Sequence, residues 1–374
     1  MNSFVEVISP GNRLTVQDLG RRGSQRFGVS VSGVLDLAAA VTANRLVGNP
    51  ATSAMLEATF GGVSLSFNSE TRVAVTGAEV NVDVNGFPMP IWETMILPAE
   101  AVLTLSIPST GLYSYISVAG GIDTPIVLNS RSTHVASALG GHEGRILAAG
   151  DTLPIGEDID GQSRPRAGTT APQSVVPGSY DRERPVRVIS APQYDAFDDD
   201  AKSKFFATSF TISNLTDRQG ARLDGASIPA IDGKHDIVSD PAFMGAIQVP
   251  SDGKPIVLLA DRQPTGGYAK IASVIGPDLP NVVQRTPGSE IAFELVGIEE
   301  AQELARGFQK SIYKTPLVEP ARISSSHLEV DGKTYNVQIV RPTTIEEEMV
   351  ADGIIYADIR DHAEVAVTVE ASHE

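Results

Sequence analysis

The sequence of 374 residues contains no cysteine. Without a thiol, the chain can form no disulfide, offer no thiolate nucleophile and bind no zinc through cysteine. Long apolar runs are missing too: uninterrupted runs stop at about five or six residues, far below the ~20 that cross a bilayer. The opening stretch MNSFVEVISPGNRLTVQD has no basic segment followed by an apolar one, so we expect no secretory signal.

Positive charge is scarce, because 29 Lys and Arg stand against 46 Asp and Glu, a formal net charge of −17. Nucleic acids and anionic membranes are bound by clustered Lys and Arg, so neither is an expected partner. Small anionic substrates remain compatible with this composition if a pocket is locally basic. We therefore expect a cytoplasmic globular protein, and the absence of cysteine fits a reducing compartment.

Short strand-like runs make up most of the chain, and Gly, Pro, Asn and Asp separate them. The clearest runs are residues 63–67, 72–80, 101–107, 113–121 and 184–190. The pair Asn85-Gly86 suits a tight hairpin turn. Helices are few, and we expect three, beginning at Asp36, near Asp198 and at Gly297. The pattern predicts a mainly β protein with barrel-like or sandwich-like units.

Composition divides the chain into parts. Residues 161–185 are rich in Pro, Gly, Ser and Thr without an apolar period, which is typical of an interdomain linker. We predict a first β domain over residues 1–160, a second over residues 186–306, and a C-terminal appendage with a β-hairpin over residues 307–374. A weak similarity between QDLGRRG (17–23) and TDRQG (216–220) suggests two diverged β units.

The segment LLADRQPTGGYAK, residues 258–270, is the first of three candidate sites. An apolar strand ends there at Asp261 and Arg262, and a glycine-rich turn comes next. Such a turn exposes backbone N–H groups that bind oxyanions, and Arg262 and Lys270 add positive charge. Asp261 could orient Arg262 or act as a base. The alternative interpretation is a hairpin turn with a surface ion pair.

The second candidate site is residues 15–36, where Asp18, Arg21 and further arginines surround glycines ahead of the helix at Asp36. Glycines let a ligand approach closely, and a helix N-terminus favours an anion. The spacing matches neither a phosphate-binding loop nor the dinucleotide fingerprint. A structured loop without a ligand is the alternative.

The third candidate site is residues 118–145, where a guanidinium, hydroxyls and a titratable imidazole come from Arg131, Ser132, Thr133 and His142. A long ordered loop with exposed polar residues is the alternative. Glu57 lies between apolar neighbours, where burial would suit it to proton transfer, although a surface strand position is equally compatible. Neither a metal site nor a serine hydrolase triad is predicted, because ligand spacing and a G-x-S-x-G motif are lacking.

Many motifs occur together in one order along residues 5–297. They are QDLGRRG, VSGVLD, ANRLVGNP, LEATFGG, VTGAEV, YISVAGGID, LNSRST, LGGHEGR, GAIQVPSDGKPIVLLADRQPTGGY and KIASV. In this order they resemble the carboxyltransferase-domain family of allophanate hydrolase subunit 2, which includes the C subunit of 5-oxoprolinase and the carboxyltransferase domain of urea carboxylase. The resemblance implies two cyclophilin-like β-barrel domains with a cleft between them. It also implies a heteromer with a protein like subunit 1, or like the B subunit of 5-oxoprolinase, and with an ATP-using subunit.

The resemblance implies one of two chemistries. In the urea carboxylase branch a carboxyl group moves from carboxybiotin to an amide nitrogen, whereas in the 5-oxoprolinase branch ATP drives the opening of a lactam without biotin. Both need fixed donors for developing negative charge and a proton-transfer group. As hypotheses, Asp261 and His142 transfer protons, and an oxyanion or carboxylate site is formed by Arg131, Ser132, Thr133, Gly266, Gly267 and Lys270. Arg262 and Tyr268 would fix the loop or contact substrate, and Asp18 and Arg21 would line the entrance or brace the domain interface.

Two departures from the family bear on the substrate. Pro264 stands where the family motif has threonine, which removes one N–H donor and fixes φ. The stretch EVDGKTYNVQIV resembles the first hairpin of biotinyl carrier domains, yet no lysine occurs after Lys333, so any biotin would be carried on a separate chain.

The leading hypothesis is a carboxyltransferase-like enzyme subunit that acts with biotin and ATP on a small amide, urea or lactam. The alternatives are the C subunit of a 5-oxoprolinase, and a non-catalytic regulatory subunit that binds a kinase-inhibitor protein in its cleft.

Overall fold

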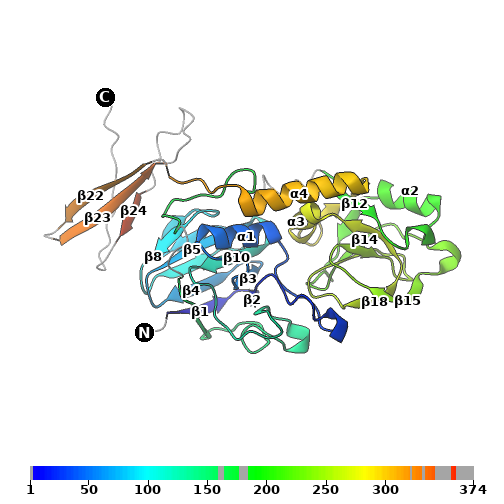
Figure 1. The fold of residues 1–374 in the computed structure, drawn as a ribbon, viewed down its shortest axis with the longest axis horizontal. Helices are drawn as coiled ribbons and strands as arrows, with labels where there is room; N and C mark the ends of the chain where they lie inside the picture. Colours follow the sequence, from blue (N-terminus) through cyan, green and yellow to red (C-terminus); the bar gives the residue numbers. More distant parts are fainter. Residues whose placement is uncertain are drawn as a thin grey trace, which may run out of the picture.

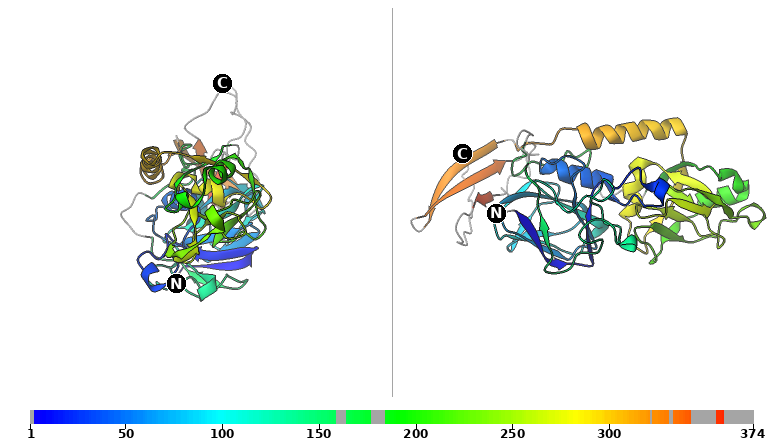
Figure 2. Two further views of the ribbon diagram at one scale, coloured as in Figure 1. Left: turned by 90° about the vertical axis from the view of Figure 1, so that its right-hand side faces the viewer. Right: turned by 60° about the horizontal axis from the view of Figure 1, so that its bottom comes forward.

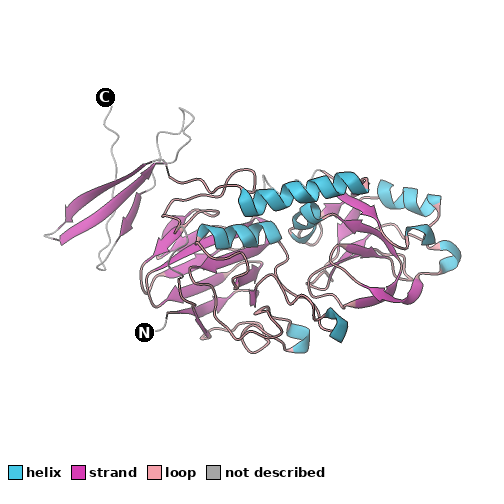
Figure 3. Cartoon of the chain, viewed as in Figure 1, coloured by secondary structure: helices cyan, strands magenta, loops and turns pink. Residues whose placement is uncertain are grey.

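Two β-rich bodies lie side by side in the computed structural model, and a long helix runs along both of them (Figure 1). The structure describes residues 3–158, 164–176, 184–320, 322–330, 333–341 and 355–358. Strands dominate both bodies, and the helices gather mainly along one side (Figure 3). The predicted mainly β fold class is confirmed.

The first body is built from two antiparallel sheets. The six-stranded sheet has the order β11-β1-β4-β9-β6-β7 and comprises β1 (Phe4–Pro10), β4 (Val63–Phe67), β6 (Val82–Val84), β7 (Phe87–Met89), β9 (Val102–Leu105) and β11 (Thr152–Pro154). The five-stranded sheet has the order β2-β3-β10-β5-β8 and comprises β2 (Arg13–Gln17), β3 (Met55–Thr59), β5 (Thr71–Glu79), β8 (Met95–Leu97) and β10 (Thr110–Val118). One face of each sheet contributes to a shared apolar core, because alternate residues such as Val63, Leu65 and Phe67 are buried.

Helix α1 (Leu37–Leu46) packs against β5 and β10 of the first body. It begins where predicted, because the Asp36 carboxylate accepts a hydrogen bond of 3.1 Å from Ala39 N. Half of its eight buried residues are alanines, whose small volume lets the helix approach the sheet closely. The helix therefore covers one face of the five-stranded sheet, on the same side of the molecule as the long helix (Figure 1).

The second body contains an eight-stranded sheet of order β20-β13-β14-β17-β16-β19-β12-β21. Its strands are β12 (Val186–Ser190), β13 (Phe210–Ile212), β14 (Gly220–Asp224), β16 (Ala246–Gln248), β17 (Ile256–Leu258), β19 (Lys270–Val274), β20 (Glu290–Ile291) and β21 (Phe293–Leu295). Strands β15 (Asp236–Pro241) and β18 (Thr265–Tyr268) form a separate antiparallel pair. Helices α2 (Asp199–Ala207) and α3 (Leu279–Val283) complete this body, and α2 begins after an Asp198 cap as predicted.

Helix α4 (Ile298–Lys314) spans both bodies. It contacts β12 of the second body and α1 of the first, and Figure 2 shows it along one edge of the molecule. Arg45 of α1 donates to the carbonyl of Ile312 at 2.9 Å and also to the carbonyl of Thr315. The boundary proposed between residues 306 and 307 falls inside α4, so the start of the predicted appendage continues a helix that begins in the second body.

A three-stranded antiparallel sheet stands apart from both bodies near the C-terminus (Figures 1 and 2). It consists of β22 (Arg322–Val330), β23 (Lys333–Arg341) and β24 (Ile355–Asp358). Strands β22 and β23 pair with Val330 opposite Lys333, which confirms the predicted hairpin.

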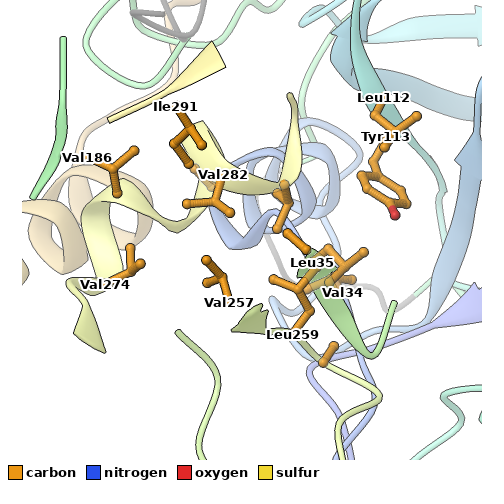
Figure 4. Packing of buried hydrophobic residues seen from close by; sticks show 14 of the residues in the cluster. Val34, Leu35, Leu112, Tyr113, Val186, Val257, Leu259, Val274, Val282 and Ile291 are labelled. Atoms are coloured by element: carbon orange, nitrogen blue, oxygen red, sulfur yellow. The ribbon is translucent and has the colours of Figure 1, made fainter. Parts of the chain in front are cut away.

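One apolar cluster runs through the second body and into the first. Figure 4 shows Val34 and Leu35 between Leu259 of the second body and Leu112 and Tyr113 of β10. The bodies are therefore joined by a continuous core, as in obligate interfaces, and not by a thin contact.

Residues 164–176, inside the segment predicted as a linker, lie against the first body. Ala171 N donates to Trp92 O at 2.9 Å, and Ala167, Ala171 and Val175 are buried. Residues 159–163 and 177–183 lie outside the described part of the chain. The domain limits stay a proposal. No helix in the described ranges has the length and apolar character that a membrane span requires.

Candidate functional site

The segment from Asp18 to Asp36 runs along the seam between the two bodies. Ser32 N donates to Ala260 O at 3.1 Å, and Ser30 Oγ donates to Arg262 O at 2.8 Å. Its glycines are needed for this path, because Gly33 has φ of 87° and a Cβ there would lie 2.7 Å from Gly20 N. Two of the candidate sites, residues 15–36 and 258–270, are therefore in direct contact.

A buried ion cluster joins the bodies at the centre of the seam. Arg218 donates from Nε to Asp261 Oδ2 at 2.9 Å and from Nη2 to Asp261 Oδ1 at 3.1 Å, while Nη1 binds Glu57 Oε1. The same Nη2 donates to Gly33 O at 2.6 Å. Burial alone would lower the pKa of Arg218, but the two carboxylates outweigh it and raise the pKa. Glu57 and Asp261 are thus held by one guanidinium from the second body.

Gln284, directly after α3, makes a second connection across the seam. Its Oε1 accepts from Leu112 N at 2.8 Å and Tyr113 N at 2.9 Å, and its Nε2 donates to Tyr113 O and to Asp36 Oδ2. The side chain is fully buried, and its amide bonds backbone groups of β10 where the pairing with β5 is interrupted between Thr110 and Ser114.

Asp18 gathers the N-terminal polar residues. Its carboxylate accepts from Gly20 N at 2.8 Å, Ser130 Oγ at 2.7 Å, Ser132 Oγ at 2.5 Å and Arg131 N at 2.6 Å. Burial lowers the pKa of Arg21, and the charges of Asp18 and Asp261 partly oppose this shift. The predicted residues Asp18, Arg21, Arg131 and Ser132 are therefore together. The Asp18 carboxylate and the Ser132 hydroxyl are hydrogen-bonded to each other.

The remaining predicted residues of the first body lie in the same loops. Thr133 Oγ1 donates to Val16 O at 3.0 Å, and the Arg131 guanidinium binds Asp123 and Thr124 O. His142 Nε2 lies 3.5 Å from Asp151 Oδ1, which also binds Arg145. The side chains of Arg131 and His142 are partly exposed, so they can reach a ligand or partner at the surface.

The glycine pair of residues 266–267 differs from expectation. Residues 265–268 form strand β18, paired with β15, and not a turn that exposes backbone donors. The physical reason is packing: a Cβ at Gly266 would lie 2.4 Å from Gln248 Nε2, so glycine lets the strand pass over that side chain. Pro264 precedes β18, and its carbonyl accepts from Ala242 N at 2.8 Å.

A cavity of about 210 Å³ lies over β18 and is called here the glycine-strand pocket. Four predicted residues line it, namely Arg262, Gly266, Gly267 and Tyr268, and so does Gln248. Gln248 is 6% exposed, and its Nε2 has no hydrogen-bond partner within the described residues. A buried donor without a partner costs stability, and a ligand that accepts from it would remove that cost.

Arg262 is the buried cation of the glycine-strand pocket, which Arg222 and the carboxylate of Asp217 also line. It donates to two carbonyls, from Nε to Ala242 O at 3.3 Å and from Nη1 to Leu259 O at 3.1 Å. Burial lowers its pKa to about 10, so it is still charged at neutral pH. No ion pair of Arg262 is found within the described ranges, and an anionic ligand would supply the missing negative charge.

Lys270 lies on β19, paired with Gln248 of β16. Its side chain is fully buried, and Nζ is 3.0 Å from Asp240 Oδ2 on β15. The hydrogen bond from Lys270, with another from Gln193, lowers the pKa of Asp240. Lys270 thus ties β15 to β19 behind the glycine-strand pocket and does not line it.

Three residues that matter most at the seam and pocket were missed from the sequence: Arg218, Gln248 and Gln284. Arg218 lies in TDRQG, the segment matched weakly to QDLGRRG, so the repeat was a usable signal. No sequence signal marks Gln248 or Gln284, because their roles depend on tertiary packing. The catalytic roles assigned from sequence stay predictions.

The fold and seam define a two-body β protein whose ordered sequence motifs meet between and beside the bodies. The carboxyltransferase domain family, subdomains A and B, matches residues 27–295, and the chain belongs to this family. It is 36% identical to the C subunit of 5-oxoprolinase from Escherichia coli, over 82% of this chain and 96% of that protein. It is 29% identical to urea amidolyase of Saccharomyces cerevisiae, over 80% of this chain but 17% of that protein.

Solved structures agree with the family assignment. The urea amidolyase of K. lactis superposes with a TM-score of 0.76 at 26% identity, over 92% of this chain and 23% of that one. The chain therefore spans about a quarter of that much longer protein. The predicted family resemblance is confirmed, and the relatives are subunits or parts of larger enzymes.

Proposed function

We propose that this chain is the carboxyltransferase-domain subunit of a 5-oxoprolinase-type complex, which opens a small lactam at the expense of ATP. The observation that carries the proposal is the match to the C subunit of 5-oxoprolinase, which extends over nearly the whole length of that protein. A second protein of the same name, from Haemophilus influenzae, is 33% identical over 94% of its length. This reverses the order of the two chemistries given from the sequence alone.

The glycine-strand pocket supports the proposal chemically. A five-membered lactam acid presents one carboxylate and one amide carbonyl. Arg262 offers a guanidinium without a carboxylate partner among the described residues, and Gln248 offers an amide N–H without a partner there. Opening the ring adds water across the C–N bond, so the carbonyl oxygen gains negative charge and the nitrogen takes a proton. Donors fixed before the reaction stabilise that charge.

The other subunits would supply ATP use and the remaining catalytic groups. We infer one partner like the B subunit of 5-oxoprolinase and one ATP-using partner, because the two 5-oxoprolinase relatives are by name parts of a complex. Within the first body, the partly exposed side chains of Arg131 and His142 are the predicted residues best placed to meet a partner or the substrate.

Biotin-dependent carboxyl transfer to urea is the second candidate function. It is favoured by the structural match to urea amidolyase, which covers 92% of this chain. Residues 1–320 make up a smaller share than this, so the match also includes part of the C-terminal segment. In that case carboxybiotin would come from another chain, since the C-terminal segment has no lysine after Lys333.

Reconstitution with the two partner subunits tests these candidates. The expected result is ATP hydrolysis that depends on 5-oxoproline, releases glutamate and is unaffected by avidin. ATP use that depends on urea and is blocked by avidin would establish the second candidate. A complex without turnover on either substrate would leave the regulatory alternative.

A further inference from the structure

A second cavity, of about 380 Å³, lies between the two bodies and is called here the interdomain groove. Residues 19–37 line it from the first body, while Met244, Arg262 and the start of α3 line it from the second. Helix α4 forms a further wall. Its main apolar surface is formed by Val31, Leu37, Met244, Leu279, Ala305 and Phe308. A cavity of this size and character is typical of small-molecule sites.

The charge of the interdomain groove is opposite to that of the chain. Arg22 and Arg262 line it, and no Asp or Glu does so among the described residues. The whole chain has 46 acidic and 29 basic residues, so a lining of this size without a carboxylate runs against its composition. An anion entering the groove meets attraction from two guanidinium groups and no lining carboxylate.

Two buried residues that line the interdomain groove, Ser32 and Arg262, have polar groups without full partners. Ser32 is 4% exposed, and its Oγ has no hydrogen bond within the described residues. Arg262 is 8% exposed and binds carbonyls but no carboxylate there. A buried donor or charge without a partner costs stability, and a ligand that bonds both groups removes that cost.

We propose that the interdomain groove binds a small carboxylate with an apolar body. The carboxylate accepts hydrogen bonds from Arg262 and Ser32, and the apolar part lies against Met244, Leu279 and Phe308. This site is separate from the lactam pocket proposed above. The two share Arg262, which lines both cavities.

The shared guanidinium predicts coupling between the cavities. A carboxylate in the interdomain groove draws Arg262 toward the seam and leaves the glycine-strand pocket with one donor fewer. Binding in one cavity should therefore weaken binding in the other by the same factor. An apolar acid would act as an inhibitor that is unlike the substrate in shape.

Calorimetric titration of the full chain with octanoate tests the proposal without partners or turnover. Octan-1-ol and octylammonium have the same chain without the anionic head. We expect saturable binding of octanoate, at least about tenfold tighter than either control, because only octanoate can accept from Arg262 and Ser32.

A substitution on α4 tests the place of binding. Ala305→Phe fills the interdomain groove from the helix side, so octanoate affinity should fall about tenfold or more. Gln302→Phe adds the same ring at an exposed position of α4 and should change affinity less than about twofold. Thermal melting shows that both variants fold.

Three results would overturn the proposal. They are no saturable binding at millimolar octanoate, equal binding of octanoate and octan-1-ol, or unchanged affinity in a folded Ala305→Phe protein. Each can occur whether or not the complex opens a lactam, so failure here is distinct from failure of the proposed function.

Discussion

Arg218 and Arg262 are both buried at or beside the seam, yet their surroundings are opposite. Arg218 is 3% exposed and binds two carboxylates and a carbonyl. Arg262 is 8% exposed and binds only two carbonyls within the described residues, while two cavities open onto it. Their pKa values move in opposite directions accordingly, upward for Arg218 and down to about 10 for Arg262.

The difference separates a structural charge from a binding charge. Arg218, whose three nitrogens already bind two carboxylates and a carbonyl, serves to fix the two bodies. A buried guanidinium without a carboxylate leaves part of its desolvation cost uncompensated, and a ligand anion can offset it. A structural and a ligand-binding guanidinium are both buried and charged. They are distinguished by whether carboxylates of the protein bind them.

The largest expected effect comes from Arg218→Met. The substitution leaves Glu57 and Asp261 buried and unpaired, so the free energy of unfolding should fall by about 3–5 kcal/mol. Urea denaturation of the isolated chain measures it. Neutralising both carboxylates in the same background, with Glu57→Gln and Asp261→Asn, should restore much of the loss.

An exposed ion pair provides the control for Arg218. Lys254 Nζ lies 2.8 Å from Asp224 Oδ1, with about half of each side chain exposed. Lys254→Met should leave the denaturation midpoint unchanged within error. If it costs as much as Arg218→Met, the seam cluster has no special role in stability.

Asp18→Asn should have the next largest effect. The carboxylate accepts four hydrogen bonds, and an amide would turn its own donors toward some of those groups. We expect a loss of about 2–3 kcal/mol, seen as a lower denaturation midpoint. Asp123→Asn, on the exposed partner of Arg131, should cost less than about 1 kcal/mol. Equal losses would contradict a central role for Asp18.

The sequence predicted the periodic and local features of this molecule well. The three helix starts at Asp36, Asp198 and Gly297 were predictable because capping and helical spacing are local, and so were most strands. The family was predictable because ten motifs keep one order along the chain. Fold class could be inferred from both.

Pairing across the seam could not be predicted. The sequence makes Asp261 and Glu57 candidates for chemistry, but it does not reveal that Arg218, 43 and 161 residues away, binds both. The pair Gly266-Gly267 suggested a turn, because glycine near a charged pair usually marks one, whereas here it makes room for Gln248. Such roles depend on contacts between distant segments.

In contrast to Arg218→Met, Arg262→Gln should affect ligand binding and not stability. Stability should change little, because two carbonyl bonds are lost while the cost of burying the charge is removed. The KM for the lactam in the reconstituted complex should rise about tenfold, and octanoate affinity should fall similarly. Arg45→Gln is the matched control, since Arg45 also binds only carbonyls in the described chain but lines neither cavity. A stable Arg262→Gln protein with unchanged KM and octanoate affinity would remove Arg262 from both proposals.

Alkaline pH removes the charge of Arg262 reversibly and should have a smaller effect than Arg262→Gln. Burial lowers the pKa of Arg262 to about 10, so the guanidinium loses its charge as pH rises through that value. Octanoate affinity should be level between about pH 7 and 9 and fall above about pH 10. Without ligand, the free energy of unfolding should instead rise as pH passes through this pKa, because deprotonation removes the cost of burying the charge. A level profile to about pH 10.5 in a protein that remains folded would contradict this assignment.

Gln248→Met should have the smallest effect, and it repeats the comparison with amides in place of guanidinium groups. Gln248 Nε2 has no partner in the described residues, whereas Gln284 uses both ends of its amide across the seam. Gln248→Met keeps the volume and removes one donor, so KM for the lactam should rise about threefold to fivefold with stability unchanged or slightly higher. Gln284→Met should lower the denaturation midpoint and leave KM unchanged. The opposite outcome would be a higher KM in Gln284→Met and a lower denaturation midpoint in Gln248→Met. It would mean that the hydrogen bonds of the ligand-free protein do not distinguish structural from ligand-binding side chains.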